Sequence, residues 1–142
     1  MGFNVLIVDD SSTIRKIIGR NLRQSGLGIS EIYEAGNGQD ALAVLESQVV
    51  EAVLTDINMP VMDGIQLLCA IRKKAIWASI PVIMITTEAG ADAVVDAVSK
   101  GATGYIKKPF TPAEIHDQMA PILKRVAPAT APALVRDSCK VP

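Results

Sequence analysis

The most constraining feature of this sequence is a short apolar run that ends abruptly in two acids. Residues 5–8 are all apolar and mostly β-branched, and Asp9 and Asp10 follow directly. A second apolar run, residues 52–55, ends on Asp56. Such runs are typical of strands buried on both faces, as in a parallel sheet. The sequence therefore predicts two central strands with carboxylates at their carboxyl ends.

Shorter runs predict three further strands, at residues 32–35, 82–85 and 105–106. Apolar residues at helical spacing follow each predicted strand, and we expect them to face the sheet. They are Ile14, Ile17, Ile18 and Leu22; Ala41, Leu42 and Leu45; Ile65, Leu68 and Ile71; Val94, Val95 and Val98; and Ile115, Met119, Ile122 and Leu123. This alternation predicts an α/β fold, a parallel sheet between two layers of helices joined by right-handed crossovers.

The last predicted helix has a clear beginning. Thr111 is a capping residue, Pro112 occupies the first helical position, and Glu114 completes a capping box. Pro121 lacks a backbone N–H, so we expect it to kink or shorten this helix. Residues 127–142 are rich in Ala and Pro, which predicts a flexible tail after a domain of residues 1–126.

Composition excludes several classes of protein. Hydrophobic residues make up 49% of the chain and the net charge is −1, so a nucleic-acid-binding protein is not expected. No apolar run approaches the roughly 20 residues that span a bilayer. The start of the chain does not resemble a signal peptide. Cys69 and Cys139 lack metal-type spacing, which favours free thiols in the cytoplasm. We expect a monomeric cytoplasmic protein without membrane insertion.

Polar residues gather where the predicted strands end. In open α/β sheets this edge carries the site, and here it would bring together Asp9, Asp10, Asp56, Thr86 and Lys108. Crowded carboxylates need a cation or raised pKa values, and oxygen ligands suit Mg²⁺. A hydroxyl and an ammonium group can hold phosphoryl oxygens, and a carboxylate that attacks phosphorus forms an acyl phosphate.

Four segments carry a resemblance to a known family. They are VDDSS from Val8, TDINMPVMDG from Thr55, TTEA from Thr86 and GYIKKPF from Gly104. In this order they resemble the marks of response-regulator receiver domains, nearest to the single-domain regulators of chemotaxis. The resemblance covers residues 3 to 126. It implies a flavodoxin-like (βα)5 three-layer sandwich with a five-stranded parallel sheet in the order 2-1-3-4-5.

The resemblance also implies roles for the site residues. Asp10, Asp56 and the backbone carbonyl of Asn58 would bind Mg²⁺ directly, and Asp9 would act through water. Asp56 would become a 4-aspartylphosphate by accepting phosphate from the phosphohistidine of a histidine kinase. Thr86 and Lys108 would hold the phosphoryl group. The chain would be a phosphoacceptor switch that assists its own phosphorylation and dephosphorylation, not an enzyme.

The implied switch involves Thr86, which would move inward, and Tyr105, which would change from exposed to buried. This would reshape the face made by the fourth helix, the fifth strand and the fifth helix, where a downstream protein binds. The peptide between Lys108 and Pro109 is expected to be cis.

Two positions depart from the chemotaxis regulators. Ile57 replaces an aromatic residue, and Thr87 is bulkier than the usual Ala or Gly. Asn58, Thr87 and Glu88 match the positions that tune hydrolysis of the phosphorylated form. We expect slower phosphate loss because Thr87 would obstruct the attacking water.

Alternative functions stay open from the sequence. The downstream target is either a flagellar motor switch or, for a phosphorelay intermediate, a histidine phosphotransfer protein. A haloacid-dehalogenase-type phosphatase also uses an Asp nucleophile with Mg²⁺, but it requires Asp-x-Asp where this chain has Asp9-Asp10-Ser11. A flavin protein would need more than 4% aromatic residues. His116 and Trp77 are interpreted as a surface residue and a packing residue, and Cys69 as a small core residue.

Overall fold

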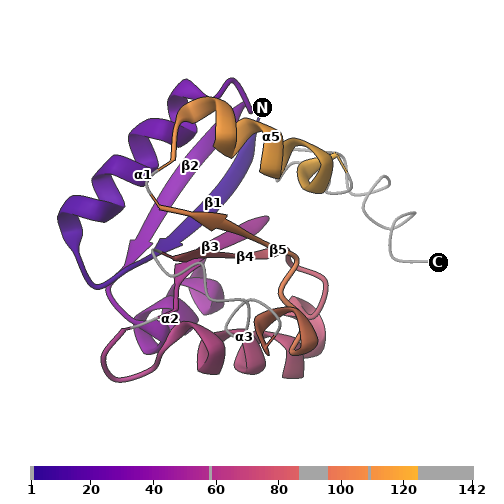
Figure 1. Cartoon of the computed structure of the whole chain (residues 1–142). Coiled ribbons are helices and arrows are strands. Elements are labelled where there is room, and N and C mark those ends of the chain that lie inside the picture. The colour runs from indigo at the N-terminus through magenta and orange to yellow at the C-terminus, as the bar shows by residue number, and fades with distance from the viewer. Residues whose placement is uncertain (1, 58, 87–95, 109, 125–142) are drawn as a thin grey trace.

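The fold is a five-stranded parallel sheet between two layers of helices (Figure 1). The computed structural model describes residues 2–57, 59–86, 96–108 and 110–124. The strands are β1 (Phe3–Val8), β2 (Ile29–Ala35), β3 (Ala52–Asp56), β4 (Val82–Thr86) and β5 (Gly104–Lys107). Every neighbouring pair is parallel and the order is β2-β1-β3-β4-β5. The predicted fold class and strand order are confirmed.

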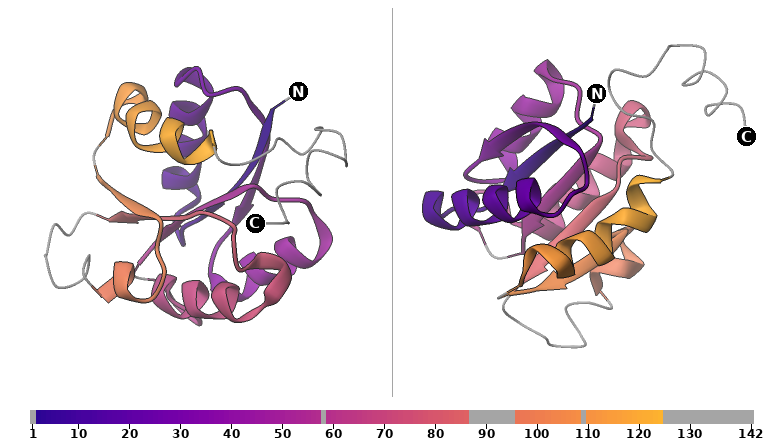
Figure 2. Two further views of the ribbon diagram at one scale, coloured as in Figure 1. Left: turned by 90° about the vertical axis from the view of Figure 1, so that its right-hand side faces the viewer. Right: turned by 90° about the horizontal axis from the view of Figure 1, so that it is seen from above.

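Helices cover both faces of the sheet, as Figures 1 and 2 show. One face carries α1 (Ser12–Gln24) and α5 (Pro112–Leu123), and the other carries α2 (Gly38–Ser47) and α3 (Gly64–Lys73). A short 3-10 helix, η1 (Ala75–Trp77), follows α3. Residues 96–99 are helical and belong to the predicted fourth helix, while Val94 and Val95 lie outside the described residues.

Successive residues of β1 supply two separate cores. Val5 and Ile7 pack with residues of α1 and α5, whereas Leu6 and Val8 pack with residues of α2 and α3. All four are 0% exposed. Side chains of a strand alternate between faces, so a strand covered on both sides must be apolar throughout. This explains the uninterrupted apolar run.

Helix caps position the loops around the sheet. Asp63 and Gln66 form a reciprocal capping box at the start of α3, a signal that the sequence interpretation missed. The predicted capping box of Thr111 and Glu114 is present at α5. Helix α5 continues through Pro121 to Leu123. A proline so near the end of a helix removes only one bond of the final turn.

Three expectations about burial were wrong. Val98 is 54% exposed, and the neighbouring Ala97, at 2%, is the residue that faces the core. Adjacent helical positions differ by about 100° in direction, so one of the two must point outward. Ile17 is 44% exposed for the same reason, since Ile18 faces the sheet. Cys69 is half-buried and free, not a full member of the core.

Trp77 is buried and His116 is exposed, as predicted. Strand β2 begins at Ile29, three residues before the predicted start. In the described part of the chain, none of the helices combines the length and apolar character that crossing a bilayer requires. The predicted tail, residues 127–142, lies outside the described residues.

Candidate functional site

Three carboxylates meet at the carboxyl ends of β1 and β3. Asp9 and Asp10 follow the last residue of β1, and Asp56 is the last residue of β3. The two strands are neighbours in the sheet, with Val8 opposite Thr55. One carboxylate oxygen from each acid lies within 4.8 Å of the others. The predicted convergence of these acids is confirmed.

Asp9 is the most enclosed of the three acids, with 1% of its surface exposed. Its Oδ1 accepts a hydrogen bond of 2.9 Å from the backbone N–H of Ser11, and its Oδ2 accepts one of 2.9 Å from Lys108 Nζ. Its backbone N–H donates to the carbonyl of Ala35 on β2. Burial of an ionised carboxylate is tolerated only with such partners, so the site depends on Lys108.

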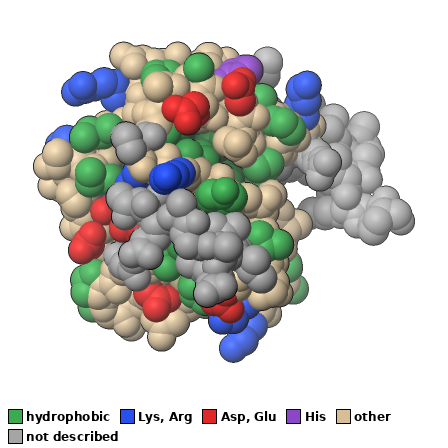
Figure 3. Space-filling view, in the orientation of Figure 1, with side chains coloured by type: hydrophobic (Ala, Val, Ile, Leu, Met, Phe, Trp, Pro, Cys, Tyr) green, Lys and Arg blue, Asp and Glu red, His purple; other side chains and the backbone are tan. Residues whose placement is uncertain are grey.

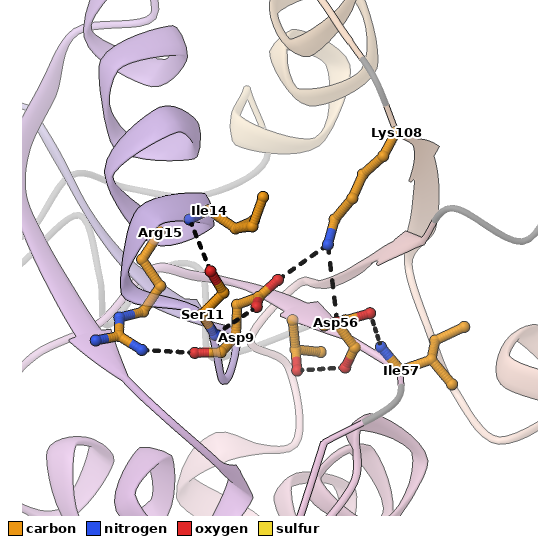
Figure 4. A network of polar contacts seen from close by, with 8 residues as sticks. Asp9, Ser11, Ile14, Arg15, Asp56, Ile57 and Lys108 are labelled. Carbon is orange, nitrogen blue, oxygen red and sulfur yellow. Dashed lines mark hydrogen bonds and ion pairs between the residues drawn. The ribbon is translucent and has the colours of Figure 1, made fainter.

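Lys108 bridges two of the acids, as Figure 4 shows. It follows β5 and reaches across the strand ends, with Nζ 2.9 Å from Asp9 Oδ2 and 3.7 Å from Asp56 Oδ2. Its side chain is 14% exposed. The structure thus brings the predicted amine to the predicted acids, with its shorter contact to Asp9.

Asp56 is held at the end of its strand by local contacts. Its Oδ1 accepts a 2.8 Å bond from the N–H of Ile57, and its carbonyl accepts a 2.9 Å bond from the hydroxyl of Thr55. The backbone of Gly64 packs so closely against the Asp56 carbonyl that a Cβ at Gly64 would overlap it. The side chain of Asp56 is 17% exposed and Asp10 is exposed, so reactants can reach both acids from solvent.

Arg15 is a site residue that the sequence interpretation missed. Its Nη1 donates a 2.7 Å bond to the backbone carbonyl of Asp9 (Figure 4). Its Nε lies 2.8 Å from Glu34 Oε1. A cation in the first turn of a helix is unfavourable toward the helix dipole. The position of Arg15 in the first turn of α1 could therefore have identified it from the sequence, because a cation at this position needs compensating hydrogen-bond acceptors.

Several predicted site residues lie wholly or partly outside the described part of the structure. The backbone of Thr86 ends β4 beside Lys107 of β5, at the edge where the acids lie, while its side chain is outside the described part of the structure. Asn58, Thr87, Glu88 and Pro109 also lie outside the described residues. Their predicted roles in metal binding, hydrolysis and the cis peptide stay predictions. Tyr105 is 42% exposed on β5.

The donor set of the cluster fits Mg²⁺. Asp9, Asp10 and Asp56 offer only oxygen atoms, close enough to share one ion. Magnesium prefers a few carboxylates and keeps water in its remaining positions. The exposed side of Asp10 leaves room for such water.

A doubly wound parallel sheet with acids and a lysine at its strand ends defines the class of the protein. A family model described as response regulator receiver domain matches residues 5–120. The chain belongs to this family.

Individual relatives agree with this assignment. The chain is 42% identical over 122 residues to the chemotaxis protein CheY of Pseudomonas aeruginosa, covering 86% of this chain and 97% of that protein. It is 42% identical to CheY-3 of Vibrio cholerae, covering 86% and 92%.

Among solved structures, CheY4 of Vibrio cholerae gives a TM-score of 0.74 at 32% identity, covering 89% of this chain and 100% of that one. The CheX-CheY-BeF3-Mg complex from Borrelia burgdorferi gives 0.77 at 32% identity, covering 85% and 89%. The chain is a CheY-like receiver domain of a two-component system.

Proposed function

We propose that this receiver domain is a Mg²⁺-dependent switch in which Asp56 accepts a phosphoryl group from the phosphohistidine of a histidine kinase. The observation that carries the proposal is the convergence of Asp9, Asp10 and Asp56, two of which, Asp9 and Asp56, lie beside the ammonium group of Lys108. Family membership favours this function over the phosphatase and flavin alternatives.

In the proposed transfer, a carboxylate oxygen of Asp56 attacks phosphorus. A P–O bond forms, and the P–N bond to the imidazole breaks with its electron pair passing to the ring nitrogen. Of the two carboxylate oxygens of Asp56, Oδ2 lies 3.7 Å from Lys108 Nζ, and we take it as the proposed attacking atom. The product is a 4-aspartylphosphate.

The surrounding residues would position and neutralise the phosphoryl group. Asp10, Asp56 and the carbonyl of Asn58 would hold Mg²⁺, with Asp9 acting through water. When bound, Mg²⁺ neutralises charge on phosphoryl oxygens. Lys108 is close enough to Asp56 to contact a phosphoryl oxygen after a small movement away from Asp9. Thr86 would donate the remaining hydrogen bond. These groups form a self-assisting phosphoacceptor and not the site of an enzyme that turns over many substrates.

The proposed output surface includes Tyr105 on β5 and the exposed Val98, together with α5. Tyr105 is exposed at 42%, as the unphosphorylated state requires if phosphorylation buries it. Two relatives are named chemotaxis proteins, which supports a chemotaxis pathway with a flagellar motor component as target. A cytoplasmic location accords with such partners.

The decisive experiment uses a small phosphodonor. The protein is incubated with acetyl phosphate and Mg²⁺, and the modified residue is located by mass spectrometry. We expect one added phosphoryl group on Asp56, lost in Asp56→Asn and when Mg²⁺ is removed with EDTA. Incorporation at another residue would overturn the assignment of Asp56, and multiple turnover of phosphomonoesters would favour a phosphatase.

A further inference from the structure

Helix α1 carries an unusual concentration of positive charge. Its sequence contains Arg15, Lys16, Arg20 and Arg23 but no acidic residue, in a chain whose net charge is −1. Lys16, Arg20 and Arg23 are separated by four and three positions, so they form one stripe along the helix. Like charges at these spacings repel one another and destabilise a helix.

This stripe is not neutralised within the described parts of the chain. Arg15 is committed to Glu34 and to the carbonyl of Asp9. For Lys16, Arg20 and Arg23, the described residues provide no ion pair, and all three side chains are exposed. Lys and Arg side chains project on the side of Figure 3 where Figure 1 places α1.

The stripe borders a groove between α1 and β2. The groove has a volume of about 300 Å³. Four of its lining residues are basic, and the others are Gly19, Ile32 and Glu34. A Cβ on Gly19 would meet Ile32 and Ile7 only at 3.8 Å, an ordinary contact. Packing therefore does not require glycine at this position, and the missing side chain leaves a small apolar notch.

Strand β2 forms the other wall and is the edge strand of the sheet. Within the described residues it pairs only with β1. Figure 2 shows α1 lying alongside this end of the sheet. An edge strand offers backbone groups to an added strand, and neighbouring side chains then supply specificity.

We propose that this groove, lined by Lys16, Gly19, Arg20, Arg23 and Ile32, binds an extended acidic segment of a partner protein. Carboxylates of the segment contact the basic stripe, and an apolar side chain between them enters the notch at Gly19. The segment lies along the β2 edge. About six extended residues match the length of the 13-residue helix α1.

Two other occupants fit less well. Residues 125–142 of this chain contain Arg125, Arg136 and Lys140 against one acid, Asp137, so their charge has the wrong sign. A nucleic acid carries a phosphate at every position, whereas the groove includes Gly19 and the apolar Ile32 among its basic residues. The groove does not include Asp56, so the proposal does not depend on phosphorylation.

The test measures binding of a fluorescein-labelled peptide of alternating Glu and Val, about six residues long, by fluorescence anisotropy at low salt. We expect Arg20→Glu with Arg23→Glu to weaken binding at least tenfold. The matched control is Lys73→Glu with Lys124→Glu, which changes the net charge equally at two exposed lysines outside the groove. It should bind within about twofold of the unaltered protein. Equal weakening in both double variants would overturn the proposal.

Two further arms separate the groove from a general basic face. Gly19→Leu fills the notch without changing charge, and we expect it to weaken peptide binding severalfold, with thermal melting used to show that the variant is folded. Unchanged peptide binding by folded Gly19→Leu would overturn the proposal that the segment binds in this groove. A single-stranded oligonucleotide of the same charge should bind more weakly than the peptide. Equal or tighter oligonucleotide binding would replace the proposed protein segment with a nucleic acid.

Discussion

The ammonium group of Lys108 lies 2.9 Å from Asp9 and 3.7 Å from Asp56. Asp9 is 1% exposed and 99 residues earlier in the chain. The lysine therefore neutralises the most deeply buried acid of the cluster. A bound Mg²⁺ ion would place a second cation beside the same carboxylate, so Lys108 and the metal compete electrostatically.

Replacing Lys108 with Met tests this competition. We expect Mg²⁺ to bind roughly 3- to 10-fold more tightly, because a nearby positive charge is removed, as measured by isothermal titration calorimetry. Without Mg²⁺ the variant should lose about 1–3 kcal/mol of unfolding free energy, since buried Asp9 loses its partner. Lys107→Met, at the exposed neighbouring lysine, is the control. Weaker Mg²⁺ binding by Lys108→Met would contradict the competition.

Asp10→Asn separates metal binding from fold stability. Loss of one carboxylate relieves repulsion within the cluster, so the metal-free variant should melt at the same temperature or slightly higher. Mg²⁺ should stabilise the unaltered protein but stabilise Asp10→Asn much less, because ligand stabilisation depends on affinity. Thermal melts with and without Mg²⁺ measure both effects. An unchanged Mg²⁺-dependent shift would exclude Asp10 as a ligand.

Arg15 should position Asp9. Arg15→Lys keeps the charge but cannot reproduce both the bond to the Asp9 carbonyl and the pair with Glu34. We expect weaker Mg²⁺ binding and a loss of about 1 kcal/mol of stability. Glu34→Gln, which leaves the bond to Asp9 possible, is the matched variant and should affect Mg²⁺ affinity less. If both variants bind Mg²⁺ normally, Arg15 is only a structural residue.

Arg72 of α3 links its helix to the segments that contain Ile80 and Gly101. Its Nε donates to the carbonyl of Gly101 at 2.9 Å and its Nη1 donates to that of Ile80 at 2.6 Å. Burial lowers the pKa of Arg72 from its ordinary value, yet the group stays charged at neutral pH. Arg72→Ala should cost about 2–4 kcal/mol in urea unfolding, since these carbonyls lose their donor. Lys73→Ala at the exposed neighbour should cost far less, and equal losses would contradict this role.

Val61 occupies a strained turn beside the site. Its φ is 69°, and the N–H of Met62 donates to the carbonyl of Pro60 across it at 2.7 Å. A β-branched residue is disfavoured at positive φ, and Val61 is 73% exposed, so its side chain contributes little packing. Val61→Gly should therefore raise the unfolding free energy by about 0.5–1 kcal/mol. Val61→Ala keeps a Cβ and should gain less. Destabilisation by Val61→Gly would show that the turn is not strained.

The sequence by itself determined the layers of the fold. Residues 5–8 and 52–55 favoured strands buried on both faces, because nearly every position in these short runs is apolar. The boundary at Thr111 was equally readable, since its capping box consists of residues three apart. The acids Asp9, Asp10 and Asp56 followed as strand-end groups.

Only the tertiary structure decided which groups meet. The contact of Lys108 with Asp9, the bond from Arg15 to the Asp9 carbonyl, and the outward direction of Val98 depend on sheet register and helix rotation. A local pattern gives the period of a helix but not which of two adjacent apolar residues faces the sheet. Distances between residues 99 positions apart are fixed by the packing of the whole sheet. The sequence thus names the groups at the strand ends, and the fold selects their pairings.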